Sequence, residues 1–393
     1  MILIQNGTLL TMTDKTYEPG DILIEGTKIK KIAKHINLPE GDTTTIIDAT
    51  GCIVTPGLIE AHCHLGISEA KMGKEGDDCN ESTKPLTPWL RALDAINPMD
   101  AAFDDAVRAG ITSAMIGPGS SNVAGGQFLF MKTKGDRVID HLTMLAPAAM
   151  KVAFGENPKV AFGDQNVMPM TRMAIAGMLR QELFHAREYL RKKKQAEKDE
   201  QTFETDFCYE SWIPVLERKI PLKAHVHRTD DILTAIRIAK EFDLKITLDH
   251  CTEGHLIAKE IADAGFPAIV GPDFASRDKI EVQNMAFKTA GILHKAGVLV
   301  AVTTDHPVSI IQSLPICAGF AAKCGLGKEE ALKAITINAA KICQVDDRVG
   351  SLEEGKDADI AIFDGFPLEV STRCLYTFIN GRLEFNIYDE QNS

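Results

Sequence analysis

The feature that most constrains the fold is a long alternation of strand-like and helix-like segments, which runs from about Pro56 to Ala340. Segments such as Asp231–Phe242 and His255–Ala264 place apolar residues at helical spacing. Between such segments lie short apolar runs, among them 110–116, 222–226, 245–250, 268–271 and 298–302. Alternating β and α units over this length predict a parallel sheet, either open or closed into a barrel.

Polar residues at the ends of the strand-like runs favour the barrel. His225, His250 and Asp305 each come at the end of an apolar run or directly after it. A (β/α)₈ barrel collects its functional residues at the carboxyl ends of its strands. A doubly wound sheet more often has a Gly-rich phosphate turn, which the sequence lacks in that context. We therefore expect an α/β chain with a (β/α)₈ TIM barrel.

The two ends of the chain have a different pattern, in which apolar and polar residues alternate between turn residues. The segments with this pattern are 2–10, 21–32, 44–54, 358–363 and 376–382. Neither group is long enough for a robust sheet of its own. We expect the two ends to combine into one small β-sandwich domain, residues 1–54 and 353–393, beside a barrel domain of residues 55–352.

Charge and cysteine content narrow the partners and the compartment. The net charge is −12, which argues against a general affinity for nucleic acid or an anionic membrane. The start has no secretion-signal pattern, and no apolar run reaches the roughly 18 residues that span a bilayer. Nine cysteines are scattered without a paired framework. We expect a cytoplasmic protein.

The sharpest motif is the run from Val54 to His64, which ends in His62-Cys63-His64. Alternation along a strand sends His62 and His64 to the same side, so both imidazoles can approach one cation. His225, His250 and Asp305 would converge on the same volume from other strands. Neutral imidazoles and carboxylates suit Zn²⁺, although Fe²⁺, Mn²⁺ and Co²⁺ accept the same donors. The sequence thus predicts a centre for one or two metal ions.

This combination resembles the amidohydrolase superfamily of metal-dependent hydrolases over almost the whole chain. The shared features are a Pro-Gly turn before His-X-His, single histidines on two later strands, an aspartate on the last strand, and segment 350–359, which returns the chain to the small domain. The resemblance includes the imidazolonepropionase, N-acetylglucosamine-6-phosphate deacetylase and dipeptidase-like branches. Glu60 stands where an aspartate is usual.

The resemblance implies a set of metal ligands. His62 and His64 would bind one metal position, His225 and His250 the other, and Asp305 would contact the metal and its water. The bridging ligand has two candidates. Glu156 resembles the glutamate ligand of N-acetylglucosamine-6-phosphate deacetylases, whereas Lys151 resembles the carboxylated lysine of the dipeptidase-like branch. We favour Glu156 and keep Lys151 as the alternative.

The resemblance also implies a reaction, the hydrolysis of a C–N bond in a small molecule by a metal-activated water. The bond would be an amide, peptide-like or cyclic amide bond rather than an ordinary protein peptide bond. Asp305 would act as general base and then acid, and His250 is the second catalytic candidate. The candidate substrate-binding residues are His227, Arg228, Asn122, Arg172 and His306.

Two alternatives remain open. A related class deaminates heterocycles with a glutamate three residues after the histidine of the fifth strand, where this sequence has Arg228, which stays protonated. A non-catalytic scaffold of the same fold would be expected to lose metal ligands, whereas all of the expected histidines and Asp305 are present. A homo-oligomer is also left open, since many enzymes of this build are dimers or larger.

Overall fold

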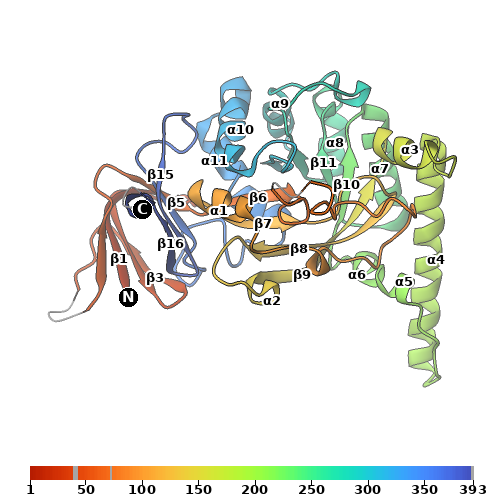
Figure 1. Ribbon diagram of the computed structural model, residues 1–393, viewed down its shortest axis with the longest axis horizontal. Helices are drawn as coiled ribbons and strands as arrows, with labels where there is room; N and C mark the ends of the chain where they lie inside the picture. The colour runs from red at the N-terminus through yellow and green to blue at the C-terminus, as the bar shows by residue number, and fades with distance from the viewer. Residues whose placement is uncertain (39–42, 71–72, 391–393) are drawn as a thin grey trace.

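The computed structural model describes residues 1–38, 43–70 and 73–390. Figure 1 shows a barrel in the centre, helices over its outer side and a small sheet at one end that holds both chain termini. The barrel strands are β6 (Leu58–Cys63), β7 (Ile111–Ile116), β8 (Ala124–Lys132), β9 (Thr143–Ala153), β10 (Leu222–Val226), β11 (Ile246–His250), β12 (Ala268–Val270) and β13 (Val300–Val302).

These strands form one eight-stranded sheet in the order β13-β12-β11-β10-β9-β8-β7-β6. Neighbouring strands are parallel except that β8 runs antiparallel to both β7 and β9. The expectation of eight parallel strands is therefore corrected at one strand.

The barrel is nearly closed between its first and last strands. The His64 N–H donates to the His306 carbonyl at 2.8 Å, and the Thr303 hydroxyl donates to the His62 carbonyl at 2.6 Å. The side chain of Glu60, fully buried in β6, adds bonds to Thr303 and Thr304. These bonds hold the segment after β13 against β6, so residues from both strands meet at one end of the barrel.

The helices cover the outside of the barrel (Figure 1). The longest is α4, whose N-terminal residue is capped by the Thr171 hydroxyl, which accepts from the Ala174 N–H at 3.1 Å. The helices are α1 (Ala101–Arg108), α2 (Ile139–Leu142), α3 (Glu156–Gly163), α4 (Arg172–Lys198), α5 (Phe207–Glu210), α6 (Ile213–Leu216), α7 (Thr229–Phe242), α8 (Ala258–Ala264), α9 (Thr289–Lys295), α10 (Leu314–Ala321), α11 (Lys328–Ala334), α12 (Ile337–Ile342) and α13 (Ile387–Glu390). None of those described is long and apolar enough to cross a membrane.

Strands from the two ends of the chain form the second sheet. They are β1 (Ile2–Leu10), β2 (Thr16–Glu25), β3 (Lys28–Ala33), β4 (Thr45–Asp48), β5 (Ile53–Pro56), β14 (Ile360–Phe363), β15 (Cys374–Ile379) and β16 (Arg382–Asn386). Their order is β16-β15-β14-β5-β1-β2-β3, with β4 paired to β1. The pairing of β5 with β14 joins the two ends. Because all eight strands belong to one hydrogen-bonded sheet, the two-layer sandwich and the domain limits drawn from it remain predictions.

A buried lysine links the barrel to the small sheet. Lys132, the last residue of β8, is 2% exposed, and its ammonium lies 2.9 Å from Asp357 Oδ2 and 2.6 Å from Asp359 Oδ2. Both aspartates lie just before β14 and are themselves buried. A buried charge is tolerated only when it is paired, so the three groups fix how β14 approaches the barrel.

Candidate metal centre

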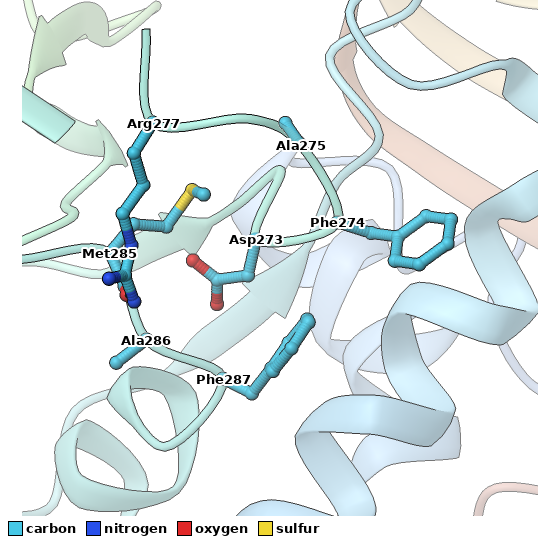
Figure 2. Close-up of a pocket in the computed structure, with 7 residues that line it drawn as sticks. All are labelled: Asp273, Phe274, Ala275, Arg277, Met285, Ala286 and Phe287. Atoms are coloured by element: carbon cyan, nitrogen blue, oxygen red, sulfur yellow. The ribbon is translucent and has the colours of Figure 1, made fainter. Parts of the chain in front are cut away.

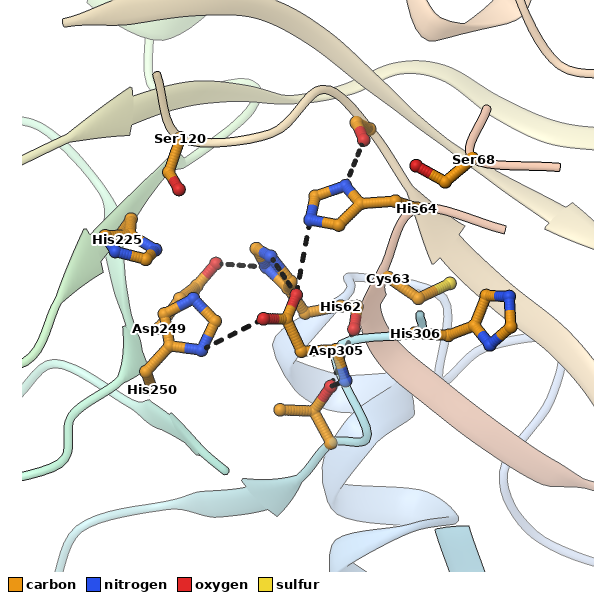
Figure 3. A network of polar contacts seen from close by, with 12 residues as sticks. His62, Cys63, His64, Ser68, Ser120, His225, Asp249, His250, Asp305 and His306 are labelled. Carbon is orange, nitrogen blue, oxygen red and sulfur yellow. Dashed lines mark hydrogen bonds and ion pairs between the residues drawn. The ribbon is translucent and has the colours of Figure 1, made fainter. Parts of the chain in front are cut away.

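His62 lies in β6 and His64 directly follows its last residue, and the two face the same side of the barrel wall, as the alternation predicts. Figure 3 shows His62, His64, His250 and Asp305 turned toward one another. Asp305 Oδ1 lies 3.2 Å from His64 Nε2 and 3.5 Å from His62 Nε2. The ligand atoms of these three residues are all within 4.8 Å of one another, a spacing that fits a single cation.

The outer nitrogens of three histidines have fixed acceptors. His62 Nδ1 lies 2.6 Å from Asp249 Oδ2, His64 Nδ1 2.7 Å from the Gly117 carbonyl, and His250 Nδ1 2.8 Å from the Gly271 carbonyl. Because a carbonyl oxygen only accepts, Nδ1 of His64 and of His250 carries a proton, which leaves Nε2 as the nitrogen of each ring that faces the cluster. This is the arrangement that metal-binding histidines have in proteins.

His250 provides a direct test of whether a metal fits. Its Nε2 is buried and has no hydrogen-bond partner among the described residues. A buried nitrogen lone pair without a donor is costly, and a cation satisfies it. The donor set of imidazoles and one carboxylate matches what Zn²⁺ and related ions bind.

The protonation states also suit metal binding. Burial lowers the pKa of His62, His225 and His250, which keeps these imidazoles neutral. Burial works against ionisation of Asp305, but His250 and His64 nearby outweigh it and lower the pKa of that carboxyl well below its usual range. These three histidines therefore offer neutral nitrogen donors beside an ionised carboxylate, whereas burial of His64 is outweighed by Cys79 and Asp305, which raise its pKa to about 10.

Two buried lysines lie against the same cluster. Lys151 Nζ, on β9, is 3.2 Å from His62 Nε2, and burial lowers its pKa to about 8. Lys223 Nζ, on β10, is 3.1 Å from Asp249 Oδ2 and also donates to the Ala61 carbonyl at 3.1 Å. Asp249 is thus shared by Lys223 and His62.

Glu156 has a different environment. It is the first residue of α3, and its backbone N–H donates to Glu281 Oε2 at 2.8 Å. Within the described part of the chain, Glu156 belongs to neither group of side chains spaced to hold a metal. Of the two candidates for a bridging ligand, Lys151 is the one whose side chain touches a histidine of the centre.

His225 belongs to a second group, with His227 and Glu281, whose ligand atoms also lie within 4.8 Å of one another. The His225 ring centroid is 4.5 Å from those of both His227 and His250. Asn157 Nδ2 lies 3.3 Å from His225 Nε2. The second group therefore adjoins the first through His250.

The other candidate substrate-binding residues are placed differently. Arg228 forms two hydrogen bonds with Asp230, at 3.0 and 3.1 Å, which engage its guanidinium outside the histidine groups. The Asn122 amide donates to the carbonyls of Glu81 and Lys84, so it holds a loop in place. Both side chains have local partners, and their roles in substrate binding stay predictions.

Arg172 and His306 are two further candidate substrate-binding residues. Arg172 pairs with the buried Asp231, its Nε 3.0 Å from Asp231 Oδ2. His306 follows Asp305 directly and accepts the Ile311 N–H through Nδ1 at 3.1 Å. Its Nε2 is buried and has no partner among the described residues, so it keeps a free polar atom.

A pocket of about 370 Å³ lies in the segment between β12 and α9, lined by Asp273, Phe274, Ala275, Arg277, Met285, Ala286 and Phe287. Figure 2 shows the Asp273 carboxylate between these side chains. Asp273 is two residues beyond Gly271, whose carbonyl holds His250. Phe274 and Phe287 both stack on Phe320, with ring centroids 5.4 and 4.6 Å away.

A barrel that gathers histidines and an aspartate at its strand ends has the architecture of an enzyme with a metal centre. The model of the amidohydrolase family matches residues 53–387. The chain therefore belongs to the amidohydrolase family, which confirms the resemblance.

Individual relatives agree with this assignment. The crystal structure of an amidohydrolase from Thermotoga maritima is 38% identical, with a TM-score of 0.94 over 98% of this chain and 100% of that one. The amidohydrolase tasK of Hapsidospora irregularis is 27% identical over 93% of this chain, which spans only 40% of that protein. A dihydroorotase of Geobacter metallireducens is 44% identical over 64 residues, 16% of this chain and 15% of that protein.

Sequence reasoning missed three residues of the site. Asp249 and Lys223 lie in the predicted strands and pair with each other. Alternation along β10 puts Lys223 on the same side as His225, so the sequence pattern could have identified Lys223. Glu281 lies in an irregular segment between β12 and α9, where periodicity gives no orientation. Only the folded chain brings it to His227.

Proposed function

We propose that this chain is a metal-dependent amidohydrolase that hydrolyses an amide, peptide-like or cyclic amide bond in a small molecule. The observation that carries the proposal is the inward direction of three histidine Nε2 atoms, whose Nδ1 atoms are fixed by Asp249, Gly117 and Gly271. Family membership supports the reaction class, and the site supports the use of a metal.

The residues proposed to hold metal are His62, His64 and Asp305 for one ion, and His225 and His250 for a second. Zn²⁺ is the metal we propose, because the donors are imidazole nitrogens and carboxylate oxygens; Fe²⁺, Mn²⁺ and Co²⁺ are the alternatives. When bound, such an ion lowers the pKa of water and polarises a carbonyl group.

For the bridging ligand we propose Lys151 in place of Glu156. Two features support it: the 3.2 Å approach of its Nζ to His62 Nε2, and burial, which lowers its pKa to about 8 and so favours the free amine. A free amine adds CO₂ and loses a proton to give a carbamate, which offers two oxygens to metal ions. Glu156 has no comparable contact with the histidines among the described residues.

Asp305 is proposed as the proton carrier. Its carboxylate is ionised and lies against His64 and His62, so it can take a proton from the attacking water and pass it to the leaving nitrogen. His306, with its free Nε2, is proposed to bind the substrate. The pocket around Asp273 is proposed to receive the part of the substrate beyond the scissile bond.

The proposed substrates include several classes of amide. Solved structures with the same fold include a prolidase complexed with N-methylphosphonate-L-proline, at 18% identity and a TM-score of 0.59, a likeness that shows the fold alone. The dihydroorotase match covers 16% of this chain. Dipeptides and cyclic amides are therefore both included in the assay below.

The nine cysteines are all free, which supports a reducing compartment such as the cytoplasm.

The experiment is a metal analysis combined with a release assay. Purified protein is assayed for bound transition metal and for hydrolysis of N-acyl amino acids, dipeptides, cyclic amides and aminated heterocycles. Bound metal with amide hydrolysis supports the proposal, and ammonia release from a heterocycle supports the deaminase. A protein without metal and without turnover, after purification from metal-supplemented medium, would favour the non-catalytic scaffold.

A further inference from the structure

We propose that Lys279 and Ser120 bind a carboxylate group of the substrate beside the metal centre. The substrate would then be an amide that carries a carboxylate next to its scissile bond, as N-acyl amino acids and dipeptides do. This inference rests on the function proposed above, which includes both charged and neutral amides. It keeps His225 with His250 in the centre and gives roles to two residues that have none in that function.

The side chain of Asn157 connects both residues to the centre. The Lys279 ammonium donates to Asn157 Oδ1 at 2.7 Å. At the other end of the same amide, Nδ2 donates to Ser120 Oγ at 2.7 Å and lies 3.3 Å from His225 Nε2. Because an ammonium only donates, its bond fixes which end of the amide faces His225. One amide group and its two contacts therefore separate the charge of Lys279 from a proposed metal ligand.

The three side chains come from separate segments that meet at the carboxyl ends of the barrel strands. Ser120 lies between β7 and β8, Asn157 lies in α3 shortly after β9, and Lys279 lies in the segment between β12 and α9. Figure 3 shows Ser120 on the His225 side of the histidine cluster. All three are half-buried, so a ligand can reach them. Segments at this face of a barrel are the ones that bind substrate.

The charge of Lys279 is not compensated by the protein. Among the described residues its ammonium forms no ion pair, and its printed partner is the neutral amide of Asn157. Glu281, two residues further along the chain, turns its carboxylate toward His227, with Oε1 3.7 Å from His227 Nε2. Two positive groups of this region, Arg172 and Arg228, already have aspartate partners at 3.0 Å. Lys279 is therefore a cation that remains available to an anionic ligand.

The Ser120 hydroxyl supplies a second donor. Its oxygen accepts from Asn157, and its proton has no acceptor among the described residues. An ammonium and a hydroxyl on either side of one amide can donate to the two oxygens of a carboxylate, and such charge-assisted bonds are stronger than neutral ones. In an N-acyl amino acid a single carbon atom separates the carboxylate from the scissile bond. A substrate whose carbonyl lies at the histidines would therefore bring its carboxylate to these donors.

The test compares matched pairs of substrates. N-acyl amino acids and dipeptides with several side chains are assayed beside the corresponding amino alcohols, in which a CH₂OH group replaces the carboxylate. The full chain loaded with Zn²⁺ should have the higher kcat/KM for the carboxylates. Lys279→Met should lower kcat/KM for the carboxylates by about 10- to 100-fold, the loss expected for one hydrogen bond to a charged group. Its kcat/KM for the amino alcohols and its metal content should stay unchanged, and Lys279→Arg, which retains a cation, should keep most of the preference.

Lys288→Met is the matched control, because it removes the same charge from an exposed lysine just before α9. It should keep the preference for carboxylates. The proposal is overturned if the wild-type chain hydrolyses both members of each pair equally well, if Lys279→Met keeps the preference, or if Lys288→Met also loses it.

Calorimetric titration with the same N-acyl amino acids decides the case of a chain without turnover. Binding that is lost in Lys279→Met and kept in Lys288→Met would support the carboxylate site and show that the proposed hydrolysis is the part that fails. Binding that does not depend on Lys279, or no binding to the wild-type chain, would overturn the proposal.

Discussion

Glu60 accepts two hydrogen bonds from Thr304, one from the backbone N–H at 2.9 Å and one from the hydroxyl at 2.7 Å. Both residues are fully buried. Glu60 lies on the first barrel strand and Thr304 just after the last, so these bonds join the two edges of the sheet. Asp305 is the next residue, and its position beside His62 and His64 depends on this join.

Thr304→Val should test the join. Valine keeps the shape of threonine but removes one donor from the buried Glu60 carboxylate, which should lower the free energy of unfolding by about 1–3 kcal/mol. Urea unfolding of the two proteins measures the change. Thr304→Ser, which keeps the hydroxyl, is the control and should lose much less. Equal stability of wild type and Thr304→Val would show that the hydroxyl bond contributes nothing.

Asp249→Asn should weaken metal binding at His62. The carboxylate orients the His62 ring from 2.6 Å and raises its basicity, and loss of such partners reduces metal affinity about 10–100-fold in other proteins. Competition for Zn²⁺ with a chromogenic chelator gives the affinity. Asp263→Asn, at an exposed position paired with Lys259, should leave the affinity unchanged. An unchanged affinity in Asp249→Asn would contradict the orienting role.

Asp305→Asn should separate proton transfer from metal binding. The amide oxygen can still contact a cation, but the side chain no longer accepts a proton, so kcat should fall by about 10²- to 10⁴-fold. Steady-state kinetics on the best substrate, with metal counts on the same sample, measure both quantities. Turnover at the wild-type level would rule out Asp305 as the proton carrier.

A pair of variants distinguishes the two bridging candidates. Lys151→Met removes the amine that lies 3.2 Å from His62 Nε2 and should lower both metal content and activity. Glu156→Gln should change neither, because the backbone N–H rather than the carboxylate of Glu156 makes the bond to Glu281. Metal loss in Glu156→Gln alone would restore the glutamate as the bridging ligand.

Asp273→Asn should change how stability depends on pH. Burial raises the pKa of Asp273 to about 7 in the folded protein, whereas in the unfolded chain it is about 3.9. The folded state therefore binds this proton more tightly, and the stability this gives is complete below about pH 4 and lost as the pH rises through about 7.

The asparagine side chain does not ionise, so the variant should gain stability relative to wild type between about pH 5 and pH 8. The expected gain is on the order of 1–3 kcal/mol. Thermal or urea unfolding at both pH values measures it. A difference that does not vary with pH would mean that Asp273 is not desolvated in the folded chain.

The sequence was enough to predict the barrel and the main cluster. Helical and strand periodicity identified the alternating units, and the two-residue spacing of His62 and His64 set their common direction. Residues at strand ends, such as His250, converge because the strand ends of a barrel surround one opening. These are properties of regular backbone, which local patterns encode.

The features that the sequence did not predict depend on strand pairing and on contacts in irregular segments. The antiparallel course of β8 depends on pairing with both neighbours and has no local signature. Arg228 follows the strand of His225, but its guanidinium turns to Asp230 two residues later. Glu281 reaches His227 only through the path of the chain after β12. The sequence places Glu156 and Lys151 near the end of one strand, so the choice between them stays a prediction that the variants above would test.

The link from Lys132 to Asp357 and Asp359 sets an order of events during synthesis. Lys132 leaves the ribosome long before its two carboxylates exist, and β5 likewise waits for β14 on its open edge. Contacts between such distant residues form slowly, because a long loop must close first. Until the last part of the chain emerges, the nascent barrel carries an uncompensated ammonium and the first sheet an unpaired strand. A chain truncated before residue 357 would keep every metal-binding residue and still lack the partners that complete its fold.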